Sequence, residues 1–318
     1  MACDYRYCFA PESSCNLGSE DYRQCAHWTG TSDVIPDEGP DDGGGRLPWS
    51  GNSFGVIDLQ FVASRSNPTV IGVLGSPNAG KTTLLVASYL LLSHGRRLTG
   101  RLFSGSYTLG GWEHLAQSLR WGPPGYGPAF PPHTGSGAGR MPGLLHLALR
   151  QEDGALEDLL LTDAPGEWFE RWAIDRDAPE AEGARWMARH ADAFLLLADS
   201  DALAGPDRGE ARIVLSALAR RLGAEVRGRP VAVVWSKSDI AVPDSIRAAL
   251  GEVFTKAFAD YREFRASVVD HGPDDLGHAA FLDSVGALLD QGRGRAPVSI
   301  LSLPVVREDD PLLAFKGR

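Results

Sequence analysis

The stretch Gly75-Ser76-Pro77-Asn78-Ala79-Gly80-Lys81-Thr82 decides the fold of this chain. It matches the pattern G-x-x-x-x-G-K-[ST], and it connects a short apolar run (69–75) to a stretch of helical length (81–95). In that context, the backbone N–H groups of the loop and the N-terminus of the helix surround phosphate oxygens. We therefore expect Lys81 to reach the β- and γ-phosphates of a nucleotide and the Thr82 hydroxyl to bind Mg²⁺. A glycine turn before an unrelated Lys-Thr pair is the alternative, and the strand–loop–helix context argues against it.

Apolar stretches alternate with helical ones after this loop. The sequence predicts strands at 69–75, 144–150, 156–163, 193–199, 230–236 and 264–270, and helices at 81–95, 207–222, 243–260 and 278–290. The connection at 151–155 is so short that the strands on either side of it form an antiparallel hairpin. The predicted fold class is α/β, a three-layer P-loop NTPase sandwich whose mostly parallel sheet contains one antiparallel strand. Residues 96–142 are expected to be irregular.

The composition excludes several kinds of partner. The chain has 41 acidic and 31 basic residues, a net charge of -10, so it lacks the basic surface that attracts nucleic acids or anionic lipids. Its longest apolar run, Leu84 to Leu92, is far shorter than the ~20 residues of a membrane-spanning helix. No charged-then-apolar signal pattern stands at the N-terminus. We expect a cytoplasmic protein with no membrane span and no nucleic-acid partner.

A second motif, Asp163-Ala164-Pro165-Gly166, closes the strand predicted at 156–163. An Asp at the carboxyl end of a strand beside a phosphate-binding loop is expected to take part in binding Mg²⁺, in its second coordination sphere. The N–H group of Gly166 would then face a γ-phosphate. An ordinary turn after a strand is the alternative for so short a motif.

A third motif, Ser236-Lys237-Ser238-Asp239, ends the apolar strand predicted at 230–236. It resembles the guanine-recognition pattern [N/T/S]-K-x-D. The Asp239 carboxylate can accept two hydrogen bonds, from N1–H and from the exocyclic amine of guanine, whereas adenine has no donor at N1. The aliphatic stem of Lys237 can pack on the plane of the base. The motif therefore predicts selection of guanine over adenine.

Together, in this order and spacing, the three motifs resemble the GTPase domain of the translation-factor-related (TRAFAC) class. The resemblance covers about residues 67–290, and the chain is most similar to the bacterial double-GTPase family of predicted conflict systems. The N-terminal cysteines and the tail sequence DPLLAFKG are consistent with that family. The resemblance implies a Ras-like G domain that binds GTP or GDP with Mg²⁺. The nucleotide-binding residues that it implies are Gly75, Asn78, Ala79, Gly80, Lys81, Thr82, Thr83, Asp163, Gly166, Lys237, Asp239 and Ser267, the last through backbone N–H groups of Ala266-Ser267.

The catalytic segments match the class less well. The resemblance calls for a switch Thr that binds Mg²⁺ and senses the γ-phosphate; we assign it to Thr134, with Thr108 as the second choice, although both could be ordinary loop residues. Glu167 stands where related GTPases usually have a Gln or His that orients water. A carboxylate cannot donate a hydrogen bond to the γ-phosphate, and its charge repels that group. With Lys81, Thr134 and Glu167 as the catalytic set, we expect slow hydrolysis without a partner.

Two groups of side chains near Glu167 allow two interpretations each. Arg171 and Arg176 could act as internal arginine fingers, although solvated arginines are the commoner case. Three tryptophans could mark a partner surface that changes with the nucleotide, although burial against the sheet is commoner. They are Trp168, Trp172 and Trp186.

All four cysteines lie near the N-terminus, with the spacing C-x4-C-x6-C-x9-C. In a reducing cytoplasm, such a cluster favours a closed tetrahedral site for structural Zn²⁺. Disulfides or free thiols are the alternatives, because neither pair has the C-x2-C spacing of common zinc fingers. The expected ligands are Cys3, Cys8, Cys15 and Cys25.

These predictions divide the chain into four parts. They are a zinc-binding segment (1–28), an acidic Gly/Pro-rich linker (29–66), a P-loop GTPase domain (67–291) and a C-terminal tail (292–318). The expected function is a GTP-binding switch that hydrolyses GTP and responds to a protein effector or activator. A non-hydrolysing guanine-nucleotide-dependent scaffold is one alternative. An ATPase or P-loop kinase is the other, and Asp239 argues against it.

Overall fold

The computed structural model describes residues 25–28, 53–55, 58–63, 66–120, 141–268 and 276–293. The chain divides into two compact units, Met1–Leu47 and Pro48–Arg318. In the first unit, the described residues form a turn in which the N–H of Trp28 donates to the carbonyl of Cys25 (2.9 Å). Every helix and strand named below belongs to the second unit.

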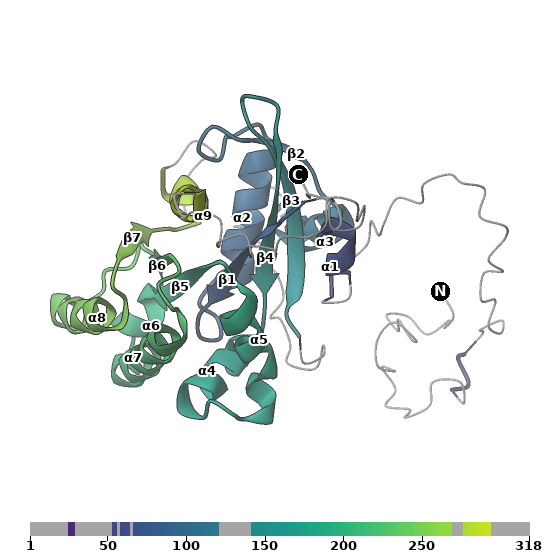
Figure 1. The fold of residues 1–318 in the computed structure, drawn as a ribbon. Helices are drawn as coiled ribbons and strands as arrows, with labels where there is room; N and C mark the ends of the chain where they lie inside the picture. Colours follow the sequence, from purple (N-terminus) through teal and green to yellow (C-terminus); the bar gives the residue numbers. More distant parts are fainter. Residues whose placement is uncertain are drawn as a thin grey trace, which may run out of the picture. The chain divides into compact units, whose positions relative to one another are not determined.

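A seven-stranded sheet forms the centre of the second unit, with the strand order β2-β3-β4-β1-β5-β6-β7 (Figure 1). β3 is antiparallel to both of its neighbours, and the other adjacent strands are parallel. The predicted α/β fold with a mostly parallel sheet and one antiparallel strand is confirmed. The strands are β1 (Thr69–Leu74), β2 (Leu102–Gly105), β3 (Gly143–Arg150), β4 (Leu156–Asp163), β5 (Ala193–Asp199), β6 (Val231–Ser236) and β7 (Tyr261–Arg265).

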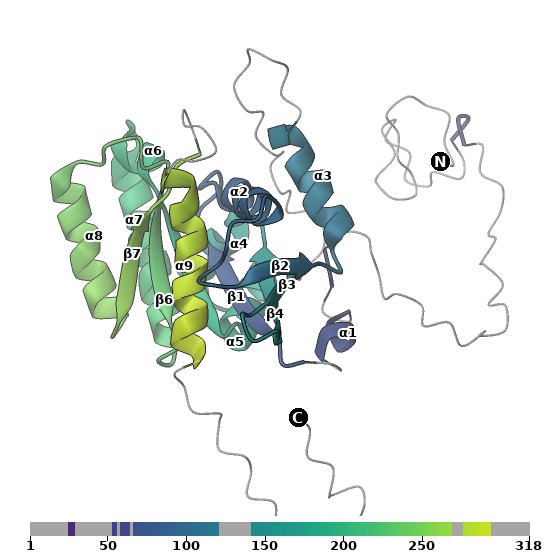
Figure 2. The same ribbon diagram turned by 90° about the horizontal axis from the view of Figure 1, so that it is seen from above.

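Helices cover both faces of this sheet (Figure 2). One face is covered by α2 (Lys81–Ser93), α3 (Leu109–Arg120) and α9 (Leu276–Arg293). The other is covered by α4 (Gly166–Ile174), α5 (Glu182–His190), α7 (Arg208–Glu225) and α8 (Asp244–Ala257). The remaining helices are short: α1 (Leu59–Ala63), α6 (Ser200–Ala204) and the 3₁₀ turn η2 (Pro179–Ala181). Among the described residues, no helix is long and apolar enough to cross a membrane.

The central strands show why the sheet needs a layer of helices on each of its two faces. Along β5, Phe194 and Leu196 pack into the core on the side of α4, α5, α7 and α8, whereas Leu195 and Leu197 pack into the core on the side of α2, α3 and α9. All four are buried. A continuous apolar run is the pattern of a parallel strand that is buried on both faces, which is how the sequence identified it.

Several elements differ from the sequence-based expectation. The range 96–142, expected to be irregular, contains β2 and α3. α4 and α5 were not expected, and β7 lies at Tyr261–Arg265 rather than at 264–270. β7 is an edge strand with charged residues, so its pairing is not accompanied by an apolar run.

Residues within the range 29–66, expected to be a linker, also pack on the sheet. Phe54 is fully buried and exchanges two backbone hydrogen bonds with Leu144 of β3 (2.8 and 3.0 Å). Val62 in α1 is fully buried as well. The described residues of 53–63 thus belong structurally to the second unit.

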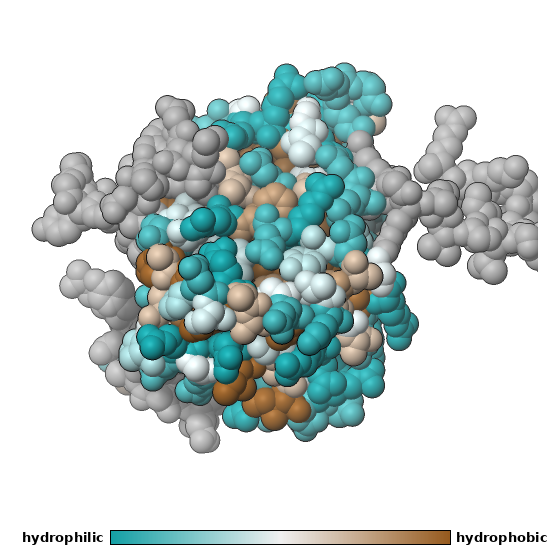
Figure 3. Space-filling view, turned by 90° about the vertical axis from the view of Figure 1, so that its left-hand side faces the viewer, coloured by the Kyte–Doolittle hydropathy of each residue, from teal (hydrophilic) through white to brown (hydrophobic). Residues whose placement is uncertain are grey.

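The surface on the side of the molecule that is at the left in Figure 1 is mixed. Figure 3 shows hydrophilic and hydrophobic residues interspersed over it. Among the described residues, the large hydrophobic side chains with the greatest exposure are Ile174 on α4 and Ile213 on α7. Scattered exposure of this kind is ordinary for a folded domain.

Candidate nucleotide-binding site

The carboxyl ends of four parallel strands meet at one edge of the sheet. β4, β1, β5 and β6 are adjacent and parallel, and Asp199 at the end of β5 pairs with Ser236 at the end of β6. The three motifs begin at the ends of β1, β4 and β6. Sequence segments more than 150 residues apart are therefore on the same edge, which is the usual place for ligands in open α/β sheets.

The loop after β1 has a backbone shaped for close approach. Asn78 (φ 60°) and Gly80 (φ 83°) both adopt the left-handed conformation, which Gly tolerates at low cost. The N–H of Ala79 donates to the carbonyl of Ser76 (3.2 Å), and α2 begins at Lys81. This leaves the N-terminus of α2, with Thr82 and the half-buried Thr83, at the edge of the sheet.

The Lys81 side chain folds back over this loop. Its Nζ donates to the carbonyls of Gly75 (2.9 Å) and Ser76 (2.9 Å), and the side chain is buried. Burial lowers the pKa of Lys81 from its ordinary 10.5 to about 8; the nearby carboxylates, Asp163 foremost, partly offset this effect. A buried ammonium with carbonyl partners is suited to exchange those partners for phosphate oxygens.

Thr82 and Asp163 are in direct contact. The Thr82 hydroxyl donates to Oδ1 of Asp163 (3.0 Å), which joins the loop after β1 to the end of β4. Hydroxyl and carboxylate oxygens are the hard ligands that Mg²⁺ prefers, so this pair fits a magnesium ion. The predicted partners are therefore together in the folded chain.

Gly166 lies against the phosphate-binding loop. A Cβ atom at this position would be 2.1 Å from the backbone nitrogen of Pro77 and 2.4 Å from the carbonyl carbon of Ser76. Only Gly allows this approach, and α4 begins at the same residue. Glu167 follows in the first turn of α4, and its charge reaches Lys81.

A second group of side chains gathers at the ends of β6 and β7. The hydroxyl of Ser267 and Oδ1 of Asp239 form a short hydrogen bond, and the N–H of Ser238 donates to the carbonyl of Ala266 (3.1 Å). The sequence predicted that Ala266 and Ser267 contribute backbone N–H groups; in the structure the N–H of Ala266 donates to the carbonyl of Trp235 (2.9 Å), and Ser267 contacts Asp239 through its side chain. Lys237 adopts a left-handed backbone (φ 50°) in the same loop.

Sequence reasoning missed one residue at this edge. Asp199, at the end of β5, forms an ion pair with Lys237 (Oδ2 to Nζ, 2.8 Å). The signal available in the sequence was an Asp that ends an apolar strand, as Asp163 does. Asp199 belongs to none of the three motifs, and nothing in the sequence around it indicated a contact with Lys237.

With this geometry in view, comparison with known proteins identifies the family. The Double-GTPase 2 family model matches residues 69–285. The chain belongs to the Double-GTPase 2 family. The resemblance predicted from the three motifs is confirmed, and the second unit contains a TRAFAC-class G domain. No curated protein matches the chain.

The solved structures that resemble this Double-GTPase 2 chain include the following two. One is the signal recognition particle receptor SRb-GTP/SRX complex from Chaetomium thermophilum, with 18% identity and a TM-score of 0.40; the match covers 70% of this chain and 99% of that one. The other is the S. cerevisiae Ski7 GTPase-like domain bound to GTP, with 13% identity and a TM-score of 0.44. That match covers 77% of this chain and 54% of the Ski7 chain.

Other predicted residues of the Double-GTPase 2 chain lie outside the described part or away from this edge. Thr134 lies outside the described residues. Thr108 is fully buried, and its hydroxyl accepts the N–H of His146 in mid-β3 (2.8 Å), so it is tied to the sheet interior. Arg176 pairs with Glu225 on α7 (2.8 Å), and Arg171 is exposed.

The tryptophans support mainly the structural interpretation. Trp168 and Trp172 are buried in the core of the Double-GTPase 2 domain. Trp186 is half-buried and stacks on His190, with ring centroids 4.7 Å apart.

The cysteine prediction falls mostly outside the described residues, because Cys3, Cys8 and Cys15 are not among them. Cys25 is half-buried and forms no disulfide with a described residue. The described residues contain no group of three or more His, Cys, Asp or Glu side chains placed to hold a metal.

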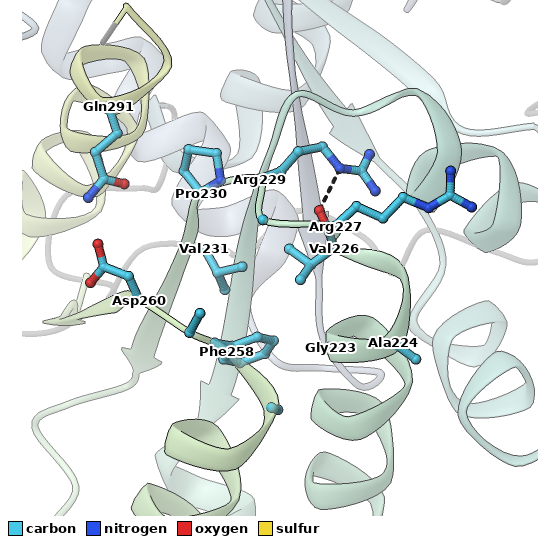
Figure 4. Close-up of a pocket in the computed structure, with 13 residues that line it drawn as sticks. Gly223, Ala224, Val226, Arg227, Arg229, Pro230, Val231, Phe258, Asp260 and Gln291 are labelled. Carbon is cyan, nitrogen blue, oxygen red and sulfur yellow. Dashed lines mark hydrogen bonds between the residues drawn. The ribbon is translucent and has the colours of Figure 1, made fainter. Parts of the chain in front are cut away.

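The Double-GTPase 2 domain has one cavity beside this site and another away from it. One, of about 390 Å³, is lined by Ser76 and Pro77 of the phosphate-binding loop together with Asp199 and Glu170. The other, of about 510 Å³, lies between the ends of α7 and α8 and the start of β6 (Figure 4). Its arginines point away from Phe258, and Nε of Arg229 donates to the carbonyl of Val226 (2.9 Å). None of the predicted nucleotide-binding residues lines this second cavity.

Proposed function

We propose that this chain is a GTP-binding molecular switch that hydrolyses GTP to GDP and phosphate in an Mg²⁺-dependent reaction. The observation that supports it best is the meeting of three motifs at one sheet edge, with Thr82 hydrogen-bonded to Asp163. A family match that includes all three motifs agrees with this interpretation.

The phosphate end of the site would be formed by the loop after β1. Backbone N–H groups of Asn78, Gly80 and the first residues of α2 would surround the phosphates, joined by that of Ala79 once it gives up its bond to the carbonyl of Ser76. Lys81 would exchange its two carbonyl partners for the β- and γ-phosphates. Thr82 and Asp163 would hold Mg²⁺, which neutralises charge on the phosphates when bound. Gly166 lies close enough to this loop for its N–H to donate a hydrogen bond to the γ-phosphate.

The base end would be formed by Asp239, Lys237 and Ser267. Asp239 accepts from N1–H and the exocyclic amine of guanine, and its bond with Ser267 fixes the orientation of the carboxylate. An adenine base would leave the carboxylate without those donors, which is the basis of discrimination.

Hydrolysis would proceed by attack of water on the γ-phosphate, with positioning and electrostatics as the main contributions. Thr134 is proposed as a further Mg²⁺ ligand, in addition to Thr82 and Asp163, and as the sensor of the γ-phosphate. Glu167 can accept from the attacking water but repels the phosphate, so we propose a slow intrinsic rate that a protein activator increases. Loss of the γ-phosphate would release the segment that begins at Gly166 and change the surface presented to an effector.

The substitution Asp239→Asn tests the guanine assignment. The wild type is expected to bind GTP and GDP and to reject ATP. The variant is expected to lose about 100-fold or more in guanine affinity and to gain affinity for xanthine nucleotides, because Asn can donate to the xanthine C2 carbonyl. Asp260→Asn, an exposed charge lining the second cavity, is the matched control. Equal binding of ATP by the wild type, or unchanged GTP affinity in the variant, would contradict the proposal.

A non-hydrolysing, nucleotide-dependent scaffold is a second candidate, and Glu167 is the residue that favours it. Single-turnover release of phosphate, with and without cell extract, separates the two functions. A lower rate in Glu167→Gln would show that Glu167 contributes to hydrolysis. Binding without phosphate release under either condition would establish the scaffold.

For the chain as a whole, we propose a division into four segments, at 1–28, 29–66, 67–291 and 292–318. Phe54 lies within the second segment but is buried against the sheet, so we propose that the part of this segment around Phe54 packs on the GTPase domain. We propose a cytoplasmic location and a structural Zn²⁺ on Cys3, Cys8, Cys15 and Cys25. Metal analysis of the purified full chain is expected to find stoichiometric zinc that Cys25→Ser lowers. Protein without zinc would overturn that part of the proposal.

A further inference from the structure

Asp199 is the residue of the sheet edge that no motif includes. We propose that Asp199 is a positioning residue for nucleotide binding, which holds Lys237 in place before the base arrives. This inference rests on the proposed function, because it concerns how the base-reading loop is prepared.

The two oxygens of Asp199 have separate partners. Oδ1 accepts the N–H of Asp201 (3.0 Å) and the N–H of Ala202 (3.4 Å), which caps the N-terminus of α6. Oδ2 accepts from Nζ of Lys237 (2.8 Å). The cap fixes the carboxylate, so the second oxygen presents a fixed target to the lysine.

The sheet sets this pairing. Asp199 and Ser236 are partners in the parallel register of β5 and β6, and the Ser236 hydroxyl donates to the carbonyl of Ala198 (3.3 Å). Lys237 is thus the first residue beyond the paired strands, and its left-handed backbone (φ 50°) is unusual for a residue with a side chain. The N–H of Ile240 donates to the carbonyl of Lys237 (3.0 Å) and closes the turn.

The environment makes the pair stronger than an ordinary surface contact. The Asp199 side chain is 9% exposed and the Lys237 side chain 31% exposed, so solvent and salt screen their attraction only in part. Asp201 lies 3.6 Å from the same ammonium, and it is mostly exposed.

An ordered Lys237 matters because a free lysine side chain loses much rotamer freedom when it packs on a base. With the ammonium held by Asp199, that loss occurs during folding rather than during binding. Both GTP and GDP carry the same base, so the benefit is expected to be equal for the two nucleotides and absent from the hydrolysis step.

The substitution Asp199→Asn separates this role from helix capping. The Asn side-chain oxygen can still accept from Asp201 and Ala202, but the charge that pairs with Lys237 is gone. We expect GTP and GDP affinity to fall by about tenfold alike, mainly through faster dissociation, while the single-turnover hydrolysis rate of bound GTP stays within about twofold. Asp260→Asn is the control, since Asp260 is exposed and lines the cavity that contains none of the predicted nucleotide-binding residues.

A double-mutant cycle with Lys237→Gln completes the test. We expect Lys237→Gln to weaken binding by itself, and Asp199→Asn to add little in its presence. Thermal unfolding of each variant shows whether the fold is kept; if Asp199→Asn does not fold, Asp199→Ser, which keeps a capping hydroxyl, replaces it. Unchanged affinity in the Asp199 variant, or additive losses in the cycle, would overturn the inference while the wild type still binds GTP. A wild type that binds no guanine nucleotide would refute the proposed function instead.

Discussion

At the scale of single residues, Lys81 is the most perturbed group of the site. Its pKa falls from 10.5 to about 8 because burial disfavours the ammonium. Above pH 8 the unfolded chain therefore binds more protons than the folded one, and the free energy of unfolding contributed by this group rises with pH up to about 10.5. Below pH 8 both states are protonated and the penalty for burying the charge is fully present.

The variant Lys81→Met tests this dependence in nucleotide-free protein kept in a chelating buffer. Between pH 8 and pH 10, the free energy of unfolding of the wild type is expected to gain on that of the variant by up to about 1.4 kcal/mol per pH unit. Denaturant unfolding at several pH values measures the difference. A constant difference across this range would show that the buried lysine keeps its ordinary pKa.

Residues within local motifs could be predicted from the sequence, and Asp199 could not. Lys81, Thr82 and Asp239 stand in short patterns whose spacing reflects the chemistry, and the structure brings each to the same sheet edge. The contact of Asp199 with Lys237 depends on the register of β5 against β6. Register is set by packing over the whole sheet, so no single stretch of sequence reveals it.

At the scale of elements, strands that contain apolar runs were predicted correctly from the sequence, whereas short amphipathic helices and strands were missed. β4 and β5 have the predicted bounds, because β5 is a nearly continuous apolar run and β4 has three consecutive leucines at its centre. α4 has nine residues, too few for a helical period to stand out, although its buried Trp168, Phe169 and Trp172 lie on one face. β2 alternates exposed and half-buried positions over only four residues, and so short an alternation does not distinguish a strand from a loop.

The contact between α7 and α8 gives a prediction at this scale. A Cβ atom on Gly223 would lie 2.5 Å from the carbonyl oxygen of Ala257, whereas one on Gly251 would meet nothing within 4 Å. Gly223→Ala is expected to push the helices apart and lower stability by about 1–3 kcal/mol. Gly251→Ala in α8 is the matched control and should raise stability by about 0.5–1 kcal/mol, because Ala restricts the unfolded chain. Denaturant unfolding measures both, and similar values for the two variants would contradict the packing argument.

At the scale of the whole molecule, composition did not reveal that residues of the predicted linker pack on the sheet. Residues 29–66 are rich in Gly, Pro and Asp, which predicted a linker, yet Phe54 and Val62 inside this range are fully buried. Ser66 adds a short hydrogen bond to the buried Asp158, which pairs with His146 (2.9 Å). A few buried side chains in a polar stretch are enough to attach it to the sheet, and average composition does not detect them.

This attachment predicts where the chain can be shortened. The second compact unit begins at Pro48, so removal of residues 1–47 is expected to leave its melting temperature nearly unchanged. Phe54→Ala in the full chain is expected to cost about 3–5 kcal/mol, because it leaves a cavity beside Tyr107 and His146 and loses a fully buried ring. For a domain of this size, that loss corresponds to a fall of roughly 6–20 °C in Tm.

Calorimetry of the full chain, of the chain without residues 1–47 and of Phe54→Ala measures these effects together. Asp58→Ala provides the control from the same stretch: the half-buried Asp58 accepts the N–H of Gly55 (2.8 Å) in an exposed contact. Removing that contact should change stability by less than about 1 kcal/mol. If Phe54→Ala melted like the wild type, the stretch around Phe54 would be a linker after all, because a fully buried ring cannot be removed from a core without cost.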